Sequence, residues 1–325
     1  MNKKNYPYNA KSALFITSDD LNPAILMEGG SLVFNPVLAL ENLKKAGDLG
    51  RRHNFTISYG FVPDYVYPEA GRMATVNFLE SKYESWRKEL KNQVKDGTCT
   101  IFAHGRHHLP GFAAPGGGYE TQKDWLYIRR IILKEFGIET FTFRSPGYQW
   151  KKSQGWSHKD YIHNLKTSGF EIVMDSAYDF YKPNDFGYTA SLSEIEDSGS
   201  INWIKLIDFL NFRRFLPGKF KFNFKKKLAE SKINEVENNM FYIGTYRDLD
   251  FNKGERGNAL ERVKLSHQRG DFIQESLLYT FFQKEEYWKI LEDIALFVNS
   301  AGINKSGGIW MPRSAEEIKK WYETA

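Results

Sequence analysis

The stretch IFAHGRHH at residues 101–108 decides how the rest of this sequence is interpreted. Together with residues 98–100, its first part is short, β-branched and aromatic, which is typical of a buried strand. The strand runs into a segment that holds three of the seven histidines of the chain. His104 and His108 are four residues apart, so a helical turn after the strand would place both imidazoles on one face. Taken alone, the segment is compatible with a divalent metal site and with a solvated turn that contains histidines by chance.

Strand and helix patterns alternate before this segment. They are strands at 13–17 and 55–62 and helices at 35–52 and 78–96. This alternation predicts an α/β fold with a parallel sheet or barrel. Asp19 and Asp20 follow the first strand, and the carboxyl ends of parallel strands share one rim, where ligands bind. We therefore expect the two carboxylates, which a metal or an arginine would stabilise against each other, to lie near His104 and His108.

The same alternation continues after the histidines. We expect helices at 122–136, 161–168, 279–298 and from 315, and strands at 140–143, 170–174, 241–246, 263–267 and 309–311. Arg144 follows one of these strands and leads into a Pro-Gly loop, whose free N–H groups could stabilise an oxyanion. An ordinary turn with a surface arginine is the alternative. Asp175 follows another predicted strand, and His267 ends a third.

Composition narrows the class of protein. The chain has 325 residues, 41% hydrophobic content and a net charge of +5, which is typical of a globular protein and argues against wholesale nucleic-acid binding. Its single cysteine, Cys99, excludes an intrachain disulfide framework. The N-terminus has no apolar signal-peptide core and no stretch approaches about 18 apolar residues, so we expect a cytoplasmic protein.

Residues 185–262 are less regular, and we expect them to form an insertion. Within it, residues 219–225 alternate phenylalanine with lysine or asparagine, so a strand would separate aromatic and basic faces. An edge hairpin with its aromatic side chains packed inward explains this pattern. Peripheral contact with an anionic membrane is the alternative.

Five short motifs, in this order, resemble those of the polysaccharide deacetylases, the NodB-homology enzymes of carbohydrate esterase family 4. They are TSDD at 17–20, HGRHH at 104–108, FRSPG at 143–147, DS at 175–176 and LSH at 265–267. The resemblance implies a distorted (β/α)7 barrel, with residues 1–325 as a single catalytic domain that carries the insertion at about 185–262. It also implies one divalent metal ion, most often Zn²⁺, and removal of acetyl groups from sugars.

The resemblance assigns a role to each motif residue. Asp20, His104 and His108 would be the metal ligands. Asp19 would be the general base, Arg144 would orient it, and His267 would be the general acid. Gly147, Tyr148 and Asp175 would contact the substrate. The sequence departs from the motifs at Leu21, where the family usually has glycine, at Gly147, where a tyrosine commonly follows the proline, and in the residues around His267.

Three functions are compatible with these residues. The first is metal-dependent hydrolysis of an N-acyl group, most often N-acetyl, on a sugar or glycan, in a setting such as surface polysaccharide biosynthesis. The second is hydrolysis of a cyclic amide or formamide on the same barrel. The third is a catalytically silent protein that binds a glycan or a partner, although the complete set of motif residues argues against it. The sequence leaves the oligomeric state open.

Overall fold

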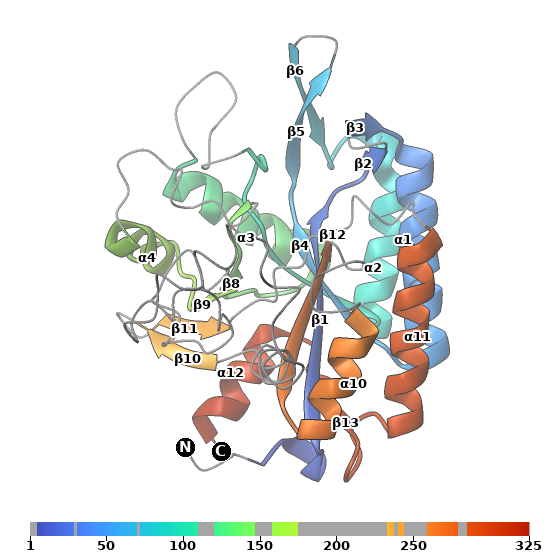
Figure 1. Cartoon of the computed structure of the whole chain (residues 1–325). Helices are drawn as coiled ribbons and strands as arrows, with labels where there is room; N and C mark the ends of the chain where they lie inside the picture. The colour runs from blue at the N-terminus through green and yellow to red at the C-terminus, as the bar shows by residue number, and fades with distance from the viewer. Residues whose placement is uncertain are drawn as a thin grey trace, which may run out of the picture.

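The computed structural model describes residues 5–28, 31–69, 72–109, 120–146, 158–174, 233–236, 240–243, 259–278 and 285–324. These residues form a curled β-sheet that helices cover on its outer side (Figure 1). Three predicted site residues, Gly147, Tyr148 and Asp175, lie outside the described residues, and so does the basic aromatic segment at 219–227.

The main sheet has the strand order β10-β11-β9-β8-β7-β4-β1-β12, and β13 also pairs with β1. Its strands are β1 (Ser12–Leu21), β4 (Ile57–Phe61), β7 (Cys99–Ala103), β8 (Thr142–Phe143), β9 (Ile172–Val173), β10 (Ile233–Val236), β11 (Met240–Ile243), β12 (Phe272–Leu278) and β13 (Ile309–Trp310). Only the β10–β11 pair is antiparallel among these pairings. The carboxyl ends of the parallel strands therefore meet at one rim, as predicted.

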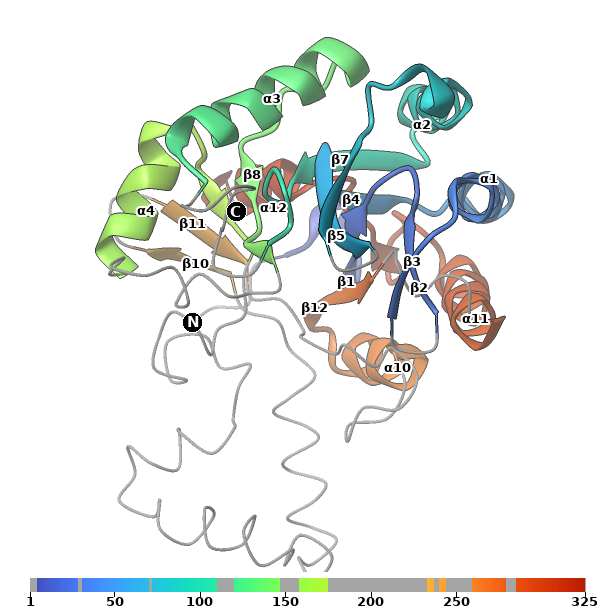
Figure 2. The same cartoon turned by 90° about the horizontal axis from the view of Figure 1, so that it is seen from above.

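Six helices follow one another around the outside of the sheet (Figure 2). They are α4 (His158–Thr167), α3 (Gln122–Phe136), α2 (Glu84–Asp96), α1 (Pro36–His53), α11 (Glu285–Ala301) and α10 (Ala259–Arg269). Local sequence signals fix several of their ends. The side chain of Asn35 accepts the Leu38 N–H at the start of α1, and Gly97 and Gly137 end α2 and α3 in the left-handed conformation. A curled parallel sheet with an outer layer of helices confirms the predicted α/β barrel architecture.

The sheet separates two hydrophobic cores. Along β1, Leu14 and Ile16 pack toward the helices, whereas Ala13 and Phe15 face the interior of the curled sheet, as the period of two requires. The last helix, α12 (Ala315–Thr324), adds Ala315 and Ile318 to the interior core. It lies at the end of the strands opposite the rim, near both chain termini (Figure 1). The amino-terminal end of the interior is thus filled by α12 and the side chains that pack against it.

Two hairpins project beyond the carboxyl rim (Figure 1). They are β2 (Ile25–Glu28) with β3 (Ser31–Phe34), and β5 (Asp64–Glu69) with β6 (Arg72–Asn77). The remaining elements are two short 3-10 helices, η1 (Pro7–Asn9) and η2 (Ser81–Tyr83). No described helix is both long and apolar enough to cross a membrane.

The strand predicted at 263–267 is wrong, because these residues belong to helix α10. Five alternating residues are also compatible with an amphipathic helix, and the buried residues of α10, Ala259, Arg262, Val263 and Ser266, have helical spacing. The strand beside β1 is instead β12, which the sequence did not reveal. Strand β11 agrees with the strand predicted at 241–246, and β10 and the start of α10 are further regular elements among the described residues of 185–262.

Strand β12 carries a buried ion pair on its outer face. Arg262 of α10 donates from Nε and Nη2 to the two carboxylate oxygens of Glu275, each at 2.8 Å, and both side chains are almost completely buried. Bidentate geometry of this kind is what a buried arginine–carboxylate pair requires. The pair explains how a strand beside β1 accommodates a glutamate.

We predict that Glu275→Leu destabilises the protein by about 3–5 kcal/mol, because it leaves the Arg262 charge buried without its carboxylate. The double variant Arg262→Met/Glu275→Leu should recover most of this loss, since both charges are then absent. Urea unfolding of the three proteins measures the difference. Equal stability of the single and double variants would contradict the assignment.

Candidate metal centre

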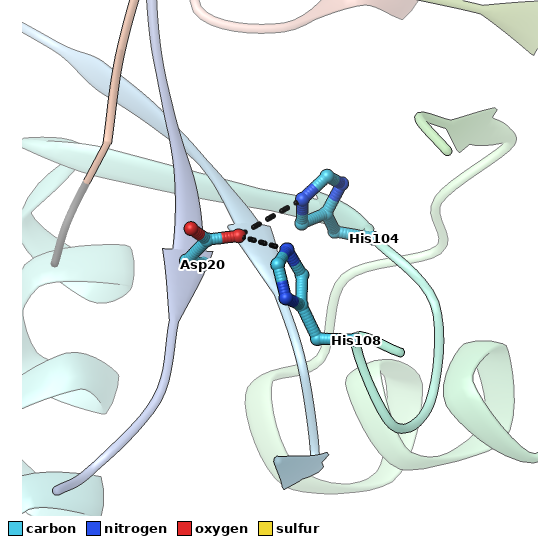
Figure 3. Close-up of side chains that lie close together, drawn as sticks. All are labelled: Asp20, His104 and His108. Atoms are coloured by element: carbon cyan, nitrogen blue, oxygen red, sulfur yellow. Dashed lines mark hydrogen bonds and ion pairs between the residues drawn. The ribbon is translucent and has the colours of Figure 1, made fainter. Parts of the chain in front are cut away.

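Asp20, His104 and His108 meet at the carboxyl rim (Figure 3). Each offers one ligand atom, and these atoms lie within 4.8 Å of one another. His104 Nε2 is 3.2 Å from Asp20 Oδ1, and His108 Nε2 contacts the same oxygen. Asp20 and His104 are buried, whereas the His108 side chain keeps 19% of its surface exposed. The three predicted ligands therefore form one cluster that remains open on the His108 side.

A β-bulge explains how two consecutive aspartates reach the same site. Adjacent residues of a regular strand point to opposite faces. The pairing of β1 with β4 shifts register between Ser18 and Leu21, and Asp20 lies in the left-handed region with φ 65°. A bulge of this kind redirects a side chain, so that the carboxylates of Asp19 and Asp20 both lie at the carboxyl rim.

Asn22 holds the main chain after the bulge. Its side-chain Nδ2 donates to the carbonyl oxygen of Asp20 at 2.8 Å, and its Oδ1 accepts the N–H of Ala24 at 3.0 Å. The Asn22 side chain is completely buried. A left-handed non-glycine residue costs of order 1–2 kcal/mol, and these hydrogen bonds help to hold Asp20 in that conformation.

The histidine segment is not the helical turn that its spacing suggested. Gly105 and His108 lie in the left-handed region, with φ of 75° and 56°. A Cβ at Gly105 would also lie 2.5 Å from Pro146 Cγ, so only glycine fits there. The turn still brings the two imidazoles together, with ring centroids 5.2 Å apart.

Each histidine ligand has a second contact that orients its ring. His104 Nδ1 lies 3.1 Å from the carbonyl oxygen of Arg144, which can only accept, so Nδ1 carries the hydrogen. In the neutral imidazole the lone pair is then on Nε2, the nitrogen next to Asp20 that a metal ion would bind. The ring of Tyr65 stacks on His108 at 5.0 Å with an interplanar angle of 11°.

Asp19 lies inside the curled sheet and is paired with Arg144. The Arg144 Nη1 donates to Asp19 Oδ1 at 2.5 Å, and both side chains are buried. Ser276 of β12 accepts from the same Nη1 at 3.1 Å and donates to Asp19 Oδ2 at 3.4 Å. The guanidinium also donates from Nε to the carbonyl oxygen of Met174. Asp19 is therefore fixed beside the ligand cluster by contacts with two other strands or strand ends.

The charges of the cluster depend on one another. Burial alone would raise the pKa of Asp20, but His108 and His104 hold this pKa well below its ordinary value. Burial would lower the pKa of His104, but Asp19 and Asp20 raise it. Burial, with a smaller contribution from Asp20, raises the pKa of the Tyr65 phenol.

The residues present fit a divalent metal ion. A carboxylate oxygen converges with two imidazoles, and the Nδ1–H of His104 is held by a carbonyl, which is the outer-shell arrangement found around histidine ligands. Burial without a cation also leaves Asp20 dependent on charge from its histidines. A divalent ion at this position would supply that charge.

The structure brings together five of the predicted site residues, Asp19, Asp20, His104, His108 and Arg144, but not His267. His267 lies on α10, and its Nδ1 is 2.9 Å from Ser12 Oγ at the start of β1. Asp19 is seven residues further along β1, which at about 3.3 Å per residue separates the two ends by roughly 20 Å. His267 therefore lies at the amino end of the strands, and its predicted role as the acid is not supported by its position.

Sequence reasoning missed Ser276, Tyr65 and Glu120. Glu120 is buried, and its Oε1 accepts the main-chain N–H groups of Arg106 at 2.8 Å and His107 at 2.7 Å. No local pattern identifies any of the three, because each acts on residues from another part of the chain. Glu120 lies two residues before the start of α3 at Gln122, a position that does not by itself indicate a contact with the histidine turn.

The chain is thus a parallel α/β barrel with a His/His/Asp cluster and a buried Asp–Arg pair at its carboxyl rim. The fold is that of the polysaccharide deacetylases. It is similar to the solved structure of a protein assigned to the polysaccharide deacetylases from Mycobacterium smegmatis (TM-score 0.52, 9% identity, covering 98% of this chain and 92% of that chain). It is also similar to the structure of Puue allantoinase (TM-score 0.52, 10% identity, covering 98% of this chain and 93% of that chain).

A third structure, of a protein assigned to the polysaccharide deacetylases from Pseudomonas aeruginosa PAO1, is also similar (TM-score 0.50, 12% identity, covering 98% of this chain and 93% of that chain). No family model matches the sequence, and no curated protein matches it by sequence. The likeness is therefore one of fold.

We predict a pH dependence of stability that comes from Glu120. Burial raises its pKa from the ordinary 4.5 to about 7. The folded protein thus holds this proton more tightly than the unfolded chain, so Glu120 lowers the free energy of unfolding as pH rises from about 4.5 to about 7, with no further change above. Relative to that of Glu120→Gln, the free energy of unfolding of the wild type should fall by about 3 kcal/mol between pH 4.5 and pH 7.

Urea unfolding with a chelator present, at pH 4.5 and pH 8, measures this difference. The ligand cluster titrates in both proteins, so its contribution cancels. A stability difference that does not vary with pH would contradict the prediction.

Proposed function

We propose that this chain is a metal-dependent hydrolase that removes an N-acyl group, most often N-acetyl, from a sugar or sugar conjugate. The observation that carries the proposal is the convergence of Asp20, His104 and His108 next to the buried Asp19–Arg144 pair. The resemblance of the motifs to the polysaccharide deacetylases supports the sugar as the carrier of the acyl group. We propose Zn²⁺ as the metal and surface polysaccharide assembly as the setting, with the chain as one catalytic domain.

Hydrolysis of an amide needs a water nucleophile, a base that takes its proton and stabilisation of the oxyanion. A divalent ion on the cluster would supply Lewis-acid polarisation of the acyl oxygen and acidify water in its vicinity. The chain positions that ion through the three ligands. The remaining tasks fall to side chains that the ion does not engage.

Asp19 is the base in this proposal. Arg144 donates to one of its carboxylate oxygens and Ser276 to the other, which fixes it next to Asp20. A carboxylate held in this way can accept a proton from the attacking water. Because His267 lies at the other end of the strands, we propose that Asp19 also returns this proton to the leaving nitrogen. One residue then performs both proton transfers.

The test separates the roles of the two aspartates. Asp20→Ala should lose metal and activity together, since it removes a ligand. Asp19→Asn should keep the metal but lower the rate by about 10²–10⁴, because an amide cannot take the proton. Arg144→Ala should retain metal and give a smaller loss. The measurement is metal content and acetate release from N-acetyl sugars, side by side.

His267→Ala is the matched control, because this histidine lies outside the cluster. It should keep both metal and activity. Loss of metal in Asp19→Asn with retention in Asp20→Ala would reverse the two roles. Unchanged hydrolysis in both aspartate variants would refute the proposal.

The acyl carrier needs its own experiment, because the fold is shared with an allantoinase and does not choose the substrate. We expect acetate release from N-acetylated sugars and no opening of small cyclic amides. The opposite result would replace the sugar in the proposal but keep the metal-dependent hydrolysis. Metal binding with no turnover of either class would support a binding protein instead.

A further inference from the structure

We propose that Glu120 is a positioning residue of the metal centre, which fixes the turn that carries His108 and thereby sets the affinity for a divalent ion. The inference rests on the proposed function only in taking Asp20, His104 and His108 as the ligands. It concerns a side chain that does not belong to the ligand cluster.

The turn at residues 104–108 needs external support. Gly105 and His108 both lie in the left-handed region, and His108 pays the steric cost that glycine avoids. Strained main chain of this kind persists only when its surroundings over-determine it. The position of the His108 imidazole follows directly from this main-chain conformation.

Glu120 supplies that support on the N–H side of the turn. Its Oε1 accepts the N–H groups of two consecutive residues, Arg106 and His107, at 2.8 and 2.7 Å. Its Oε2 accepts the indole N–H of Trp125 at 3.1 Å. The glutamate is 1% exposed and Trp125 is completely buried, so the carboxylate has little freedom to move. One side chain thus holds the peptide group between residues 105 and 106 and the one between residues 106 and 107, which lead into His108.

The carbonyl groups of the same two residues are held by strand β5. The N–H of Asp64 donates to the carbonyl oxygen of Arg106 at 3.0 Å, and the N–H of Val66 donates to that of His107 at 3.0 Å. Tyr65, which lies between these two residues of β5, stacks on the His108 ring. Glu120 therefore binds the N–H groups of the turn and β5 binds its carbonyl groups. A variant that lacks the Glu120 carboxylate keeps only the contacts with β5.

The Arg106 side chain adds a link between the same parts. It donates to Asp64 at 2.6 Å and to Asp124 in the first turn of α3 at 2.7 Å. These contacts keep the main chain of the turn close to Glu120, but the arginine head is partly exposed. We assign the positioning role to Glu120 because its bonds are buried and reach the main chain of the turn directly.

The experiment measures Co²⁺ and Zn²⁺ affinity by titration, together with the visible absorption of bound Co²⁺, in the full chain. Glu120→Leu removes both acceptors and should weaken binding by about 10–100-fold, the usual effect of changing the partners that orient metal ligands. The Co²⁺ spectrum should change as well, since His108 no longer holds its place. Gln93→Leu is the matched control.

Gln93 is also buried and also bonds to the main chain, donating to the Leu43 carbonyl oxygen at 2.6 Å between α2 and α1. Its loss should lower stability without changing metal affinity. A merely structural role for Glu120 would give the same result as Gln93→Leu.

A second pair of variants keeps the test valid if Glu120→Leu does not fold. In Glu120→Gln, the amide oxygen can still accept both main-chain N–H groups, but its NH₂ then faces the Trp125 N–H, and two donors oppose each other. Trp125→Phe removes that conflict. The double variant Glu120→Gln/Trp125→Phe should therefore bind metal as tightly as Trp125→Phe alone, whereas Glu120→Gln should bind more weakly than the wild type.

The outcomes separate this inference from the proposed function. If the wild type binds no divalent ion, the proposed metal centre is wrong and the inference falls with it. If the wild type binds an ion and folded Glu120→Leu binds it equally well with the same spectrum, the metal centre stands and the positioning role is refuted. Failure of Trp125→Phe to restore affinity in the Glu120→Gln background would also refute it.

Discussion

The Arg144 guanidinium has no exposed surface, and the carboxyl end of the barrel is arranged around it. A buried charge without partners would cost several kcal/mol. Its partners are the carboxylate of Asp19, the hydroxyls of Thr17 and Ser276, the carbonyl of Met174 and, at 5.1 Å, the ring of Phe102. They come from β1, β12, β7 and the end of β9. Because one ion ties these strands together, the position of Asp19 is set by the same contacts that hold the rim of the sheet.

The sequence was sufficient to predict the alternation of strands and helices, and from it the meeting of Asp19 and Asp20 with His104 and His108. That prediction needs only the rule that parallel strands share a rim. Strand β12 could not be predicted in the same way. Its polar residues are explained by distant partners, Glu275 by Arg262 on another element and Ser276 by a residue of β1. A strand that buries charge on one face and a hydroxyl on the other lacks the apolar pattern by which strands are recognised.

The conformation of the ligands was beyond sequence reasoning for a different reason. Asp20 and His108 are both left-handed, and neither is a glycine. Such strain persists only where buried side chains hold the main chain, here Asn22 for the first ligand and Glu120 beside the second. These supports lie two residues after Asp20 and twelve residues after His108, and neither has a motif. A ligand pattern can therefore be read from spacing, whereas the pre-organisation that makes it a site depends on tertiary contacts.

Two departures from the deacetylase motifs acquire different meanings in the structure. Leu21 stands where the family usually has glycine, but the left-handed residue of the bulge is Asp20, and Leu21 is buried and paired with Phe61 of β4. A leucine is therefore compatible with the same placement of the acidic pair. The LSH sequence at 265–267 resembles the family motif in sequence but not in position. It lies on α10, and His267 contacts Ser12 at the amino end of β1. The strand in the corresponding place beside β1 is β12, whose residues 272–278 include no histidine. The departure at Leu21 leaves the three clustered residues in place, whereas the described strand beside β1 carries no histidine in the position that the resemblance gave to the acid.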